Sequence, residues 1–179
     1  MSSMVTRHWP TNVVVSEIDL LGIVHDHIGN LLLEPSDVPF EILDPELVLA
    51  SPGKLCDALT ASMAALADAD SRPHVAQARM EVQRWGGGYD LAASASPADY
   101  VAWCVLAATE RHHEQSGGIA AEDPRAGCAM VEMPGLPWGR PLMIAATPGA
   151  HLAIPGWLTH FVVPVEKEQG VIVAVAMSV

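Results

Sequence analysis

The stretch IAATPGAHLAIPGWLTHFVVPVEKEQGVIVAVAMSV, residues 144–179, decides the fold class of this chain. It holds three short runs of apolar and β-branched residues, separated by turn residues and a polar segment: residues 151–154, 158–165 and 171–179. Turn residues between β-branched runs at this spacing predict an antiparallel array of hairpins. His160 is the one ionisable residue inside the middle run, which makes it the first candidate for chemistry.

The composition predicts one domain with a sizeable core, because the chain has 179 residues and half of them are hydrophobic. It has no long uncharged apolar stretch and no apolar signal core, so we expect a cytoplasmic protein without a membrane span. The formal net charge of −12 repels phosphate backbones, which excludes nucleic acid as an expected partner. Its three cysteines lie far apart, and reduced thiols are expected.

Helical patterns are confined to residues 19–68, and most strand patterns lie within residues 75–179. The first part predicts a strand, a helix, a loop and a second helix at residues 11–18, 20–33, 34–45 and 51–68. The second part predicts further strands before the C-terminal stretch at residues 75–85, 100–109, 118–122, 129–132 and 142–146. Helices followed by many short strands predict a mainly β fold, an antiparallel sandwich or barrel braced by helices.

A segment rich in glycine and aromatic residues predicts a ligand pocket. Three consecutive glycines at positions 86–88 permit close approach of the backbone, and aromatic rings nearby supply flat pocket walls. The candidate pocket residues here are Trp85, Tyr89 and Trp103. Core packing explains the same aromatic residues equally well. Arg125 is a candidate binding cation, although a turn held by an ion pair with Asp123 is the simpler interpretation.

Two pairs of histidines carry metal-capable side chains. His25 and His27 fall in the first predicted helix, where positions two apart point in different directions and cannot chelate one ion. His112 and His113 fall in a charged segment that predicts a loop between strands, and adjacent side chains of extended backbone point apart. We therefore expect surface or half-buried histidines at positions 25 and 27, and a charged hairpin loop around His112 and His113.

Several segments resemble a family of 2-oxoglutarate- and iron(II)-dependent oxygenases. The resemblance is carried by residues 8–13 (HWPTNV), by residues 117–125 (GGIAAEDPR) and above all by residues 148–160 (PGAHLAIPGWLTH). The last segment is similar to the strand–turn–strand unit that holds the final iron ligand of the family. The resemblance implies a double-stranded β-helix, a jelly-roll or cupin-like fold, over residues 1–179. Family habit also implies a homodimer.

Carried over position by position, the resemblance implies that His160 matches the third metal ligand. The first two ligands of the family form a His-x-His or His-x-Asp pair, and the best alignment places Ala93 and Ala95 there. The basic residue that binds the 2-oxoglutarate carboxylate belongs early in the last strand, where this chain has Gln169, Gly170 and Val171, and no Arg or Lys follows. Three of the four functional side chains are therefore missing, and we expect neither a metal nor a cofactor.

These observations leave three hypotheses. In the first, the barrel binds a small molecule and catalyses a metal-free isomerisation, cyclisation or elimination, with His160 as general acid or base. The pocket of this hypothesis comprises Trp85, Tyr89, Trp103, Arg125 and Trp157. In the second, the chain is a metal-dependent oxygenase with unconventional ligands, drawing on His112, His113 or His151 beside His160. In the third, the barrel is a non-catalytic binding or scaffold protein. Independently of these three, a core histidine satisfied by hydrogen bonds explains His160 equally well.

Overall fold

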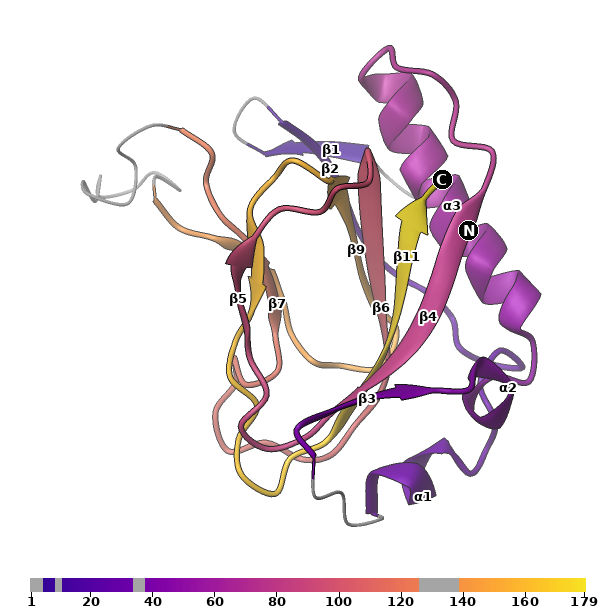
Figure 1. The fold of residues 1–179 in the computed structure, drawn as a ribbon, viewed down its shortest axis with the longest axis vertical. Coiled ribbons are helices and arrows are strands. Elements are labelled where there is room, and N and C mark those ends of the chain that lie inside the picture. The colour runs from indigo at the N-terminus through magenta and orange to yellow at the C-terminus, as the bar shows by residue number, and fades with distance from the viewer. Residues whose placement is uncertain (1–4, 9–10, 34–37, 126–138) are drawn as a thin grey trace.

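The computed structural model describes residues 5–8, 11–33, 38–125 and 139–179 (Figure 1). Two antiparallel sheets pack face to face, and a long helix covers the outer face of the larger sheet. The larger sheet has the strand order β1 (Val5–His8), β2 (Thr11–Glu17), β9 (Ala150–Pro155), β6 (Tyr100–Ala108), β11 (Val171–Ser178), β4 (Ala78–Trp85) and β3 (Phe40–Leu43). The smaller sheet has the order β5 (Leu91–Ser94), β10 (His160–Val162), β7 (Ile119–Ala121) and β8 (Leu142–Ile144). This arrangement confirms the predicted double-stranded β-helix.

β11 shows how the sequence builds two layers of core around the larger sheet. Residues 171–176 are all buried. The side chains of Val171, Val173 and Val175 pack in the core between the two sheets. Ile172, Ala174 and Ala176 pack in the second core, together with the long helix α3 (Pro52–Ala69). Successive strand side chains point to opposite faces, so a strand buried on both faces needs a continuous apolar run.

α3 confirms the predicted second helix nearly to the residue. Pro52 occupies its first turn, while Ser51 precedes the helix without making a side-chain capping hydrogen bond. The apolar side chains that recur at helical spacing, Leu55, Leu59, Met63 and Leu66, are all fully buried. Their burial fastens the helix to the outer face of the larger sheet, because each side chain removed from water contributes roughly 1.5–3 kcal/mol.

The predicted array of hairpins in the C-terminal stretch is wrong. β9 pairs with β2 and β6, β10 pairs with β5 and β7, and β11 pairs with β4 and β6. The three strands are individually present, but no two of them pair with each other. At the corner Pro155-Gly156 the chain leaves the larger sheet and crosses to the smaller one. The N–H of Gly156 donates to Asp99 O, and its carbonyl accepts from Ser96 N, which ties this corner to the loop before β6.

The predicted helix over residues 20–33 is wrong in its first half. α1 (Ile28–Leu33) begins eight residues later, and turns precede it, with Gly22 at φ +67°. His25 and His27 therefore lie outside a helix, and their rings stack with centroids 5.1 Å apart instead of pointing apart. Asp19, a capping residue in the sequence, accepts a hydrogen bond from Leu21 N at 3.0 Å, but turns follow it, so this bond alone does not start a helix.

Several strand predictions also differ from the structure. The expected loop at residues 34–45 contains β3, and α2 (Pro45–Val48) follows directly, capped by Asp44. The expected strand at residues 158–165 is limited to β10, and β1 and β5 were not predicted. The expected strand at residues 129–132 lies outside the described residues. No helix in the described part of the chain is long and apolar enough to cross a membrane.

Candidate functional site

His160 begins β10, with its side chain directed into the core between the two sheets. It is 5% exposed, and its ring meets the indole of Trp103 edge-on with centroids 4.8 Å apart. Nδ1 lies 3.0 Å from the carbonyl oxygen of Leu158, which can only accept, so Nδ1 carries the proton of the neutral ring. Burial lowers the pKa of His160. Nε2 is then a basic nitrogen, with no hydrogen bond from any described residue.

The neighbouring strand β5 is where the oxygenase resemblance places the first two metal ligands. His160 pairs directly with Ser94, so these two side chains project to the same face, and the register shifts between this pair and the pair Val162–Leu91. On the opposite side of His160, β7 presents Ala121. None of these side chains offers an imidazole or a carboxylate.

An iron(II) site of this type needs two or three fixed protein ligands. The residues beside His160 do not fit that requirement. The described ranges also hold no group of three or more His, Cys, Asp or Glu side chains close enough to hold a metal ion. At the position of the 2-oxoglutarate-binding residue, Gln169 is buried, and its side chain accepts a hydrogen bond from the hydroxyl of Ser116.

His151 lies on the opposite face of the larger sheet from His160. Its Nδ1 is 2.7 Å from Trp103 O, and its Nε2 is 2.9 Å from the Ser62 hydroxyl on α3. Both ring nitrogens are therefore occupied, and the side chain is fully buried. Burial lowers the pKa of His151. His151 is thus a core histidine whose hydrogen bonds are satisfied, and the larger sheet separates it from His160.

His112 and His113 lie in an exposed loop at the far end of the smaller sheet. Their backbone N–H groups donate to the carboxylate of Glu166 at 2.9 and 2.6 Å. These two hydrogen bonds lower the pKa of Glu166. Glu166 follows the Val162 end of β10, whereas His160 stands at the other end. The structure therefore does not bring His112, His113 or His151 to His160.

The predicted pocket residues do not lie together in one place. Trp85 is buried and stacks on Tyr89 at 5.2 Å, at the end of the barrel where β11 begins. Trp103 contacts His160. On β11, Trp103 pairs with Val175, whereas Trp85 pairs with Val171, four residues earlier. Four residues of strand span about 13 Å. Trp85 and Tyr89 therefore belong to a separate aromatic cluster, and the structure does not gather them around His160.

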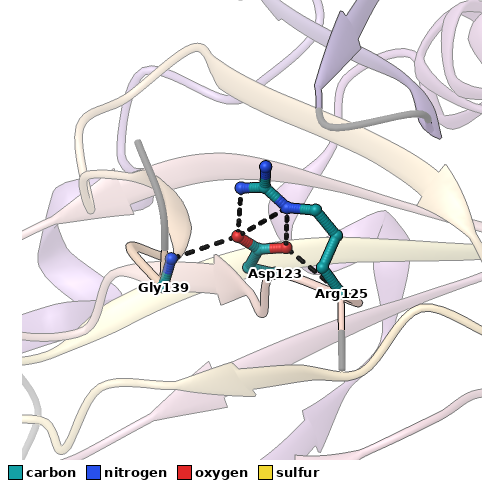
Figure 2. Close-up of polar contacts among 3 residues, drawn as sticks. All are labelled: Asp123, Arg125 and Gly139. Atoms are coloured by element: carbon teal, nitrogen blue, oxygen red, sulfur yellow. Dashed lines mark hydrogen bonds and ion pairs between the residues drawn. The ribbon is translucent and has the colours of Figure 1, made fainter. Parts of the chain in front are cut away.

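Arg125 is held in an ion pair, as the simpler interpretation of its segment predicted (Figure 2). Its Nε lies 2.9 and 3.1 Å from the two carboxylate oxygens of Asp123, and the N–H of Gly139 donates to Asp123 at 3.1 Å. The hydrogen bond from Arg125 is the main cause that lowers the pKa of Asp123 to about 2. This carboxylate joins residues 125 and 139, which flank a segment outside the described residues.

Trp157 is a predicted pocket residue that lines open space. It is 59% exposed and forms a wall of two adjacent hollows, of about 660 and 240 Å³. His160 and Trp103 line neither, although Leu158 and Thr159, just before His160, line the smaller one. The larger hollow, hereafter the Trp157 cleft, holds residues that sequence reasoning did not select: Asn12, Asp70, Arg72, Asp99 and Tyr100. They lie in three separate segments, and only the exposed Trp157 was identified from the sequence.

No protein-family model and no curated protein matches this sequence. Solved structures do match the fold. A Pseudomonas putida prolyl-4-hydroxylase aligns with a TM-score of 0.55 at 10% identity, over 78% of this chain and 70% of the hydroxylase. The non-heme alpha-ketoglutarate-dependent epimerase SnoN from nogalamycin biosynthesis aligns with a TM-score of 0.50 at 14% identity, over 93% and 76%. At these identities the similarity establishes the double-stranded β-helix fold of such oxygenases.

Proposed function

We propose that this chain uses an oxygenase-type barrel to bind a small organic molecule and to catalyse a metal-free step on it. The observation that carries the proposal is the pairing of His160 with β5. The strand that should supply the other ligands has the sequence Leu-Ala-Ala-Ser at residues 91–94. A single histidine does not hold a catalytic metal in place.

The proposal assigns proton transfer to His160. Its Nδ1–H is engaged by Leu158 O, which orients the ring and leaves Nε2 as the base. In an isomerisation, Nε2 removes a proton from a carbon next to a carbonyl group and the imidazolium returns it to another atom of the same molecule. Atoms and charge balance without an oxidant. The lowered pKa of His160 keeps the ring neutral before the reaction.

A second candidate function is binding without catalysis. The observation in its favour is the 5% exposure of His160, since a base must come within hydrogen-bonding distance of the atom it deprotonates. The smaller hollow is lined by Leu158 and Thr159, just before His160, but not by His160 itself. The two candidates share the binding of a small molecule and differ in whether His160 reacts with it.

Two experiments test the proposal. Metal analysis of protein purified without chelator should find no stoichiometric transition metal, and one metal per chain lost in a His160→Ala variant would overturn the metal-free assignment. Incubation of the bound molecule in ²H₂O should exchange its acidic C–H in the wild type and not in His160→Gln. Exchange that persists in His160→Gln would remove the catalytic role, and absence of exchange in both would favour binding alone.

A further inference from the structure

The Trp157 cleft lies at the end of the barrel where α3 stops. Its walls come from the start of β2, from the residues after α3, from the loop before β6 and from the corner after β9. The corner and the loop are joined by backbone hydrogen bonds through Gly156. A Cβ on Gly156 would lie 1.8 Å from Ala98 O, so only glycine permits this contact. The two walls that carry Trp157 and Asp99 are therefore held at a fixed separation.

One carboxylate of the cleft is held in position by the sheet. Asp70 accepts hydrogen bonds from the side-chain amide of Asn12 at 2.6 Å and from the hydroxyl of Tyr100 at 3.2 Å. Burial, followed by the nearby Asp70, raises the pKa of Tyr100 to about 12, so the phenol stays protonated and keeps donating. A carboxylate has about four acceptor positions, and these two bonds leave further ones for a ligand.

The end of α3 adds negative potential to the same place. Asp70 is the C-cap, Ser71 takes a left-handed conformation at φ +55°, and the N–H groups of Ser71 and Arg72 donate to Asp68 O and Ala67 O. This is a Schellman closure, in which serine replaces the usual glycine. The 18-residue helix has no basic residue in its last turn, so the negative end of its dipole is uncompensated within the helix.

The cleft therefore favours positive charge. Asp70 and Asp99 contribute two carboxylates, and Arg72 contributes the one cation on the wall. Arg72 directly follows the helix end, where its charge opposes the helix dipole. The chain as a whole carries a net charge of −12, which attracts cations towards the cleft. An anion such as a dicarboxylate has one favourable partner here and two unfavourable ones.

Trp157 supplies an aromatic surface on the wall of the cleft. Its indole is 59% exposed on the cleft wall, which is unusual for so large an apolar side chain. An aromatic face beside carboxylates binds ammonium groups by cation–π attraction and binds flat apolar groups by stacking.

We infer that the Trp157 cleft binds an organic ammonium ion with a flat apolar body. The body stacks on Trp157, and the ammonium group lies between Asp70 and Asp99. The inference rests on the proposed function in that the chain binds a small molecule. It adds a binding site outside the reach of His160, and the charge of the molecule that this site binds. It does not depend on how His160 acts.

Three probes that share one ring and differ in charge test the inference: benzylammonium, benzyl alcohol and benzoate. Each is titrated into ¹⁵N-labelled protein, and the backbone amide signals of Asp70, Asp99 and Tyr100 are followed. Benzylammonium should bind about 3–10-fold more tightly than benzyl alcohol, and benzoate should bind most weakly. The preference should shrink at 0.5 M salt, because exposed charges are then screened.

Variants locate the binding. Trp157→Ala should weaken benzylammonium at least about fivefold, and Asp99→Asn should weaken it about 2–5-fold without affecting benzyl alcohol. Asp57→Asn, an exposed acid on α3 away from the cleft, is the matched control and should change nothing. The inference is overturned if benzoate or benzyl alcohol binds as well as benzylammonium, if Trp157→Ala has no effect, or if no probe binds. A stoichiometric iron site would instead overturn the proposed function and leave this result standing.

Discussion

In the pairing of β10 with β5, His160 lies directly opposite Ser94. This pairing places the predicted third ligand beside the segment that the oxygenase resemblance identifies as the ligand-bearing strand. Ser94 shares the face of His160, because directly opposed side chains of an antiparallel pair project to one side. The segment at residues 91–95 contains no metal-binding side chain in any register.

The register predicts that one substitution creates a two-histidine metal site. Cβ atoms of directly opposed residues lie about 4.5–5.5 Å apart, which lets two imidazoles bind one ion. Ser94→His should therefore bind Zn²⁺ or Ni²⁺ at least about tenfold more tightly than the wild type, as measured by calorimetry. Ser94→His combined with His160→Ala is the matched control, since only one ring of the pair remains, and it should bind like the wild type. Equal gains in both variants would mean that the register is wrong.

The fold class could be predicted because it depends on local patterns. The β-branched run of β11 and the apolar spacing of α3 are each readable within one segment. Strand pairing could not be predicted in the same way. Pro155-Gly156 gives the same turn signal for a hairpin as for a corner between sheets, and only the contact of Gly156 with the loop at residues 96–99 distinguishes them.

The candidate site was predictable only in part, for a related reason. His160 was identified because an ionisable residue in an apolar strand is visible in the sequence. The Trp157 cleft was not, because Asn12, Asp70 and Asp99 meet there from distant segments. The glycines at positions 86–88 drew attention to Trp85 and Tyr89. In the structure Gly87 instead admits a close approach of the backbone at Glu166.

Ser62 should matter for stability although it is remote from the cleft. Its hydroxyl is the partner of buried His151 Nε2, and its removal leaves that nitrogen unsatisfied. We expect Ser62→Ala to lower the free energy of unfolding by about 1–3 kcal/mol in urea denaturation. Thr60→Ala is the control, because that hydroxyl bonds only to Cys56 O of the same helix. Equal losses in the two variants would show that the bond to His151 adds nothing.

Acid should destabilise the fold through its two buried histidines. Burial lowers the pKa of His151 and of His160 from the ordinary value of 6.5. Between the folded and unfolded pKa values the unfolded chain binds more protons, so the free energy of unfolding rises with pH there. The stability is complete above about pH 6.5 and falls on further acidification, by up to about 1.4 kcal/mol per pH unit for each group.

Urea denaturation at pH values from 7.5 to 5 measures this dependence. His151→Gln and His160→Gln should each flatten the decline below pH 6.5. Thr60→Ala, which replaces no titrating group, serves as the control and should keep the wild-type dependence on pH. A stability that stays constant or rises as the pH falls from 6.5 would contradict the assignment of both rings as neutral in the folded state.

Asp123 should act as a structural residue. Its side chain is inaccessible and holds Arg125 and the backbone of Gly139 (Figure 2). We expect Asp123→Asn to reduce the free energy of unfolding by about 1–3 kcal/mol at pH 7, because the charged acceptor of Arg125 is lost. The exposed neighbour Glu122 provides the control variant, Glu122→Gln. Since the pKa of Asp123 is about 2, its contribution should persist down to about pH 4. Wild-type stability in Asp123→Asn would exclude this role.

The central claim is that no second metal ligand lies beside His160, where an oxygenase-type metal site would form. An anaerobic titration with iron(II) tests this claim most directly. Calorimetry of the wild type and of His160→Ala, each with and without 2-oxoglutarate, gives the stoichiometry and the affinity. The predicted result is no stoichiometric binding of iron in the wild type and no change on adding 2-oxoglutarate. Binding of one iron per chain that 2-oxoglutarate tightens and that His160→Ala abolishes would contradict the account.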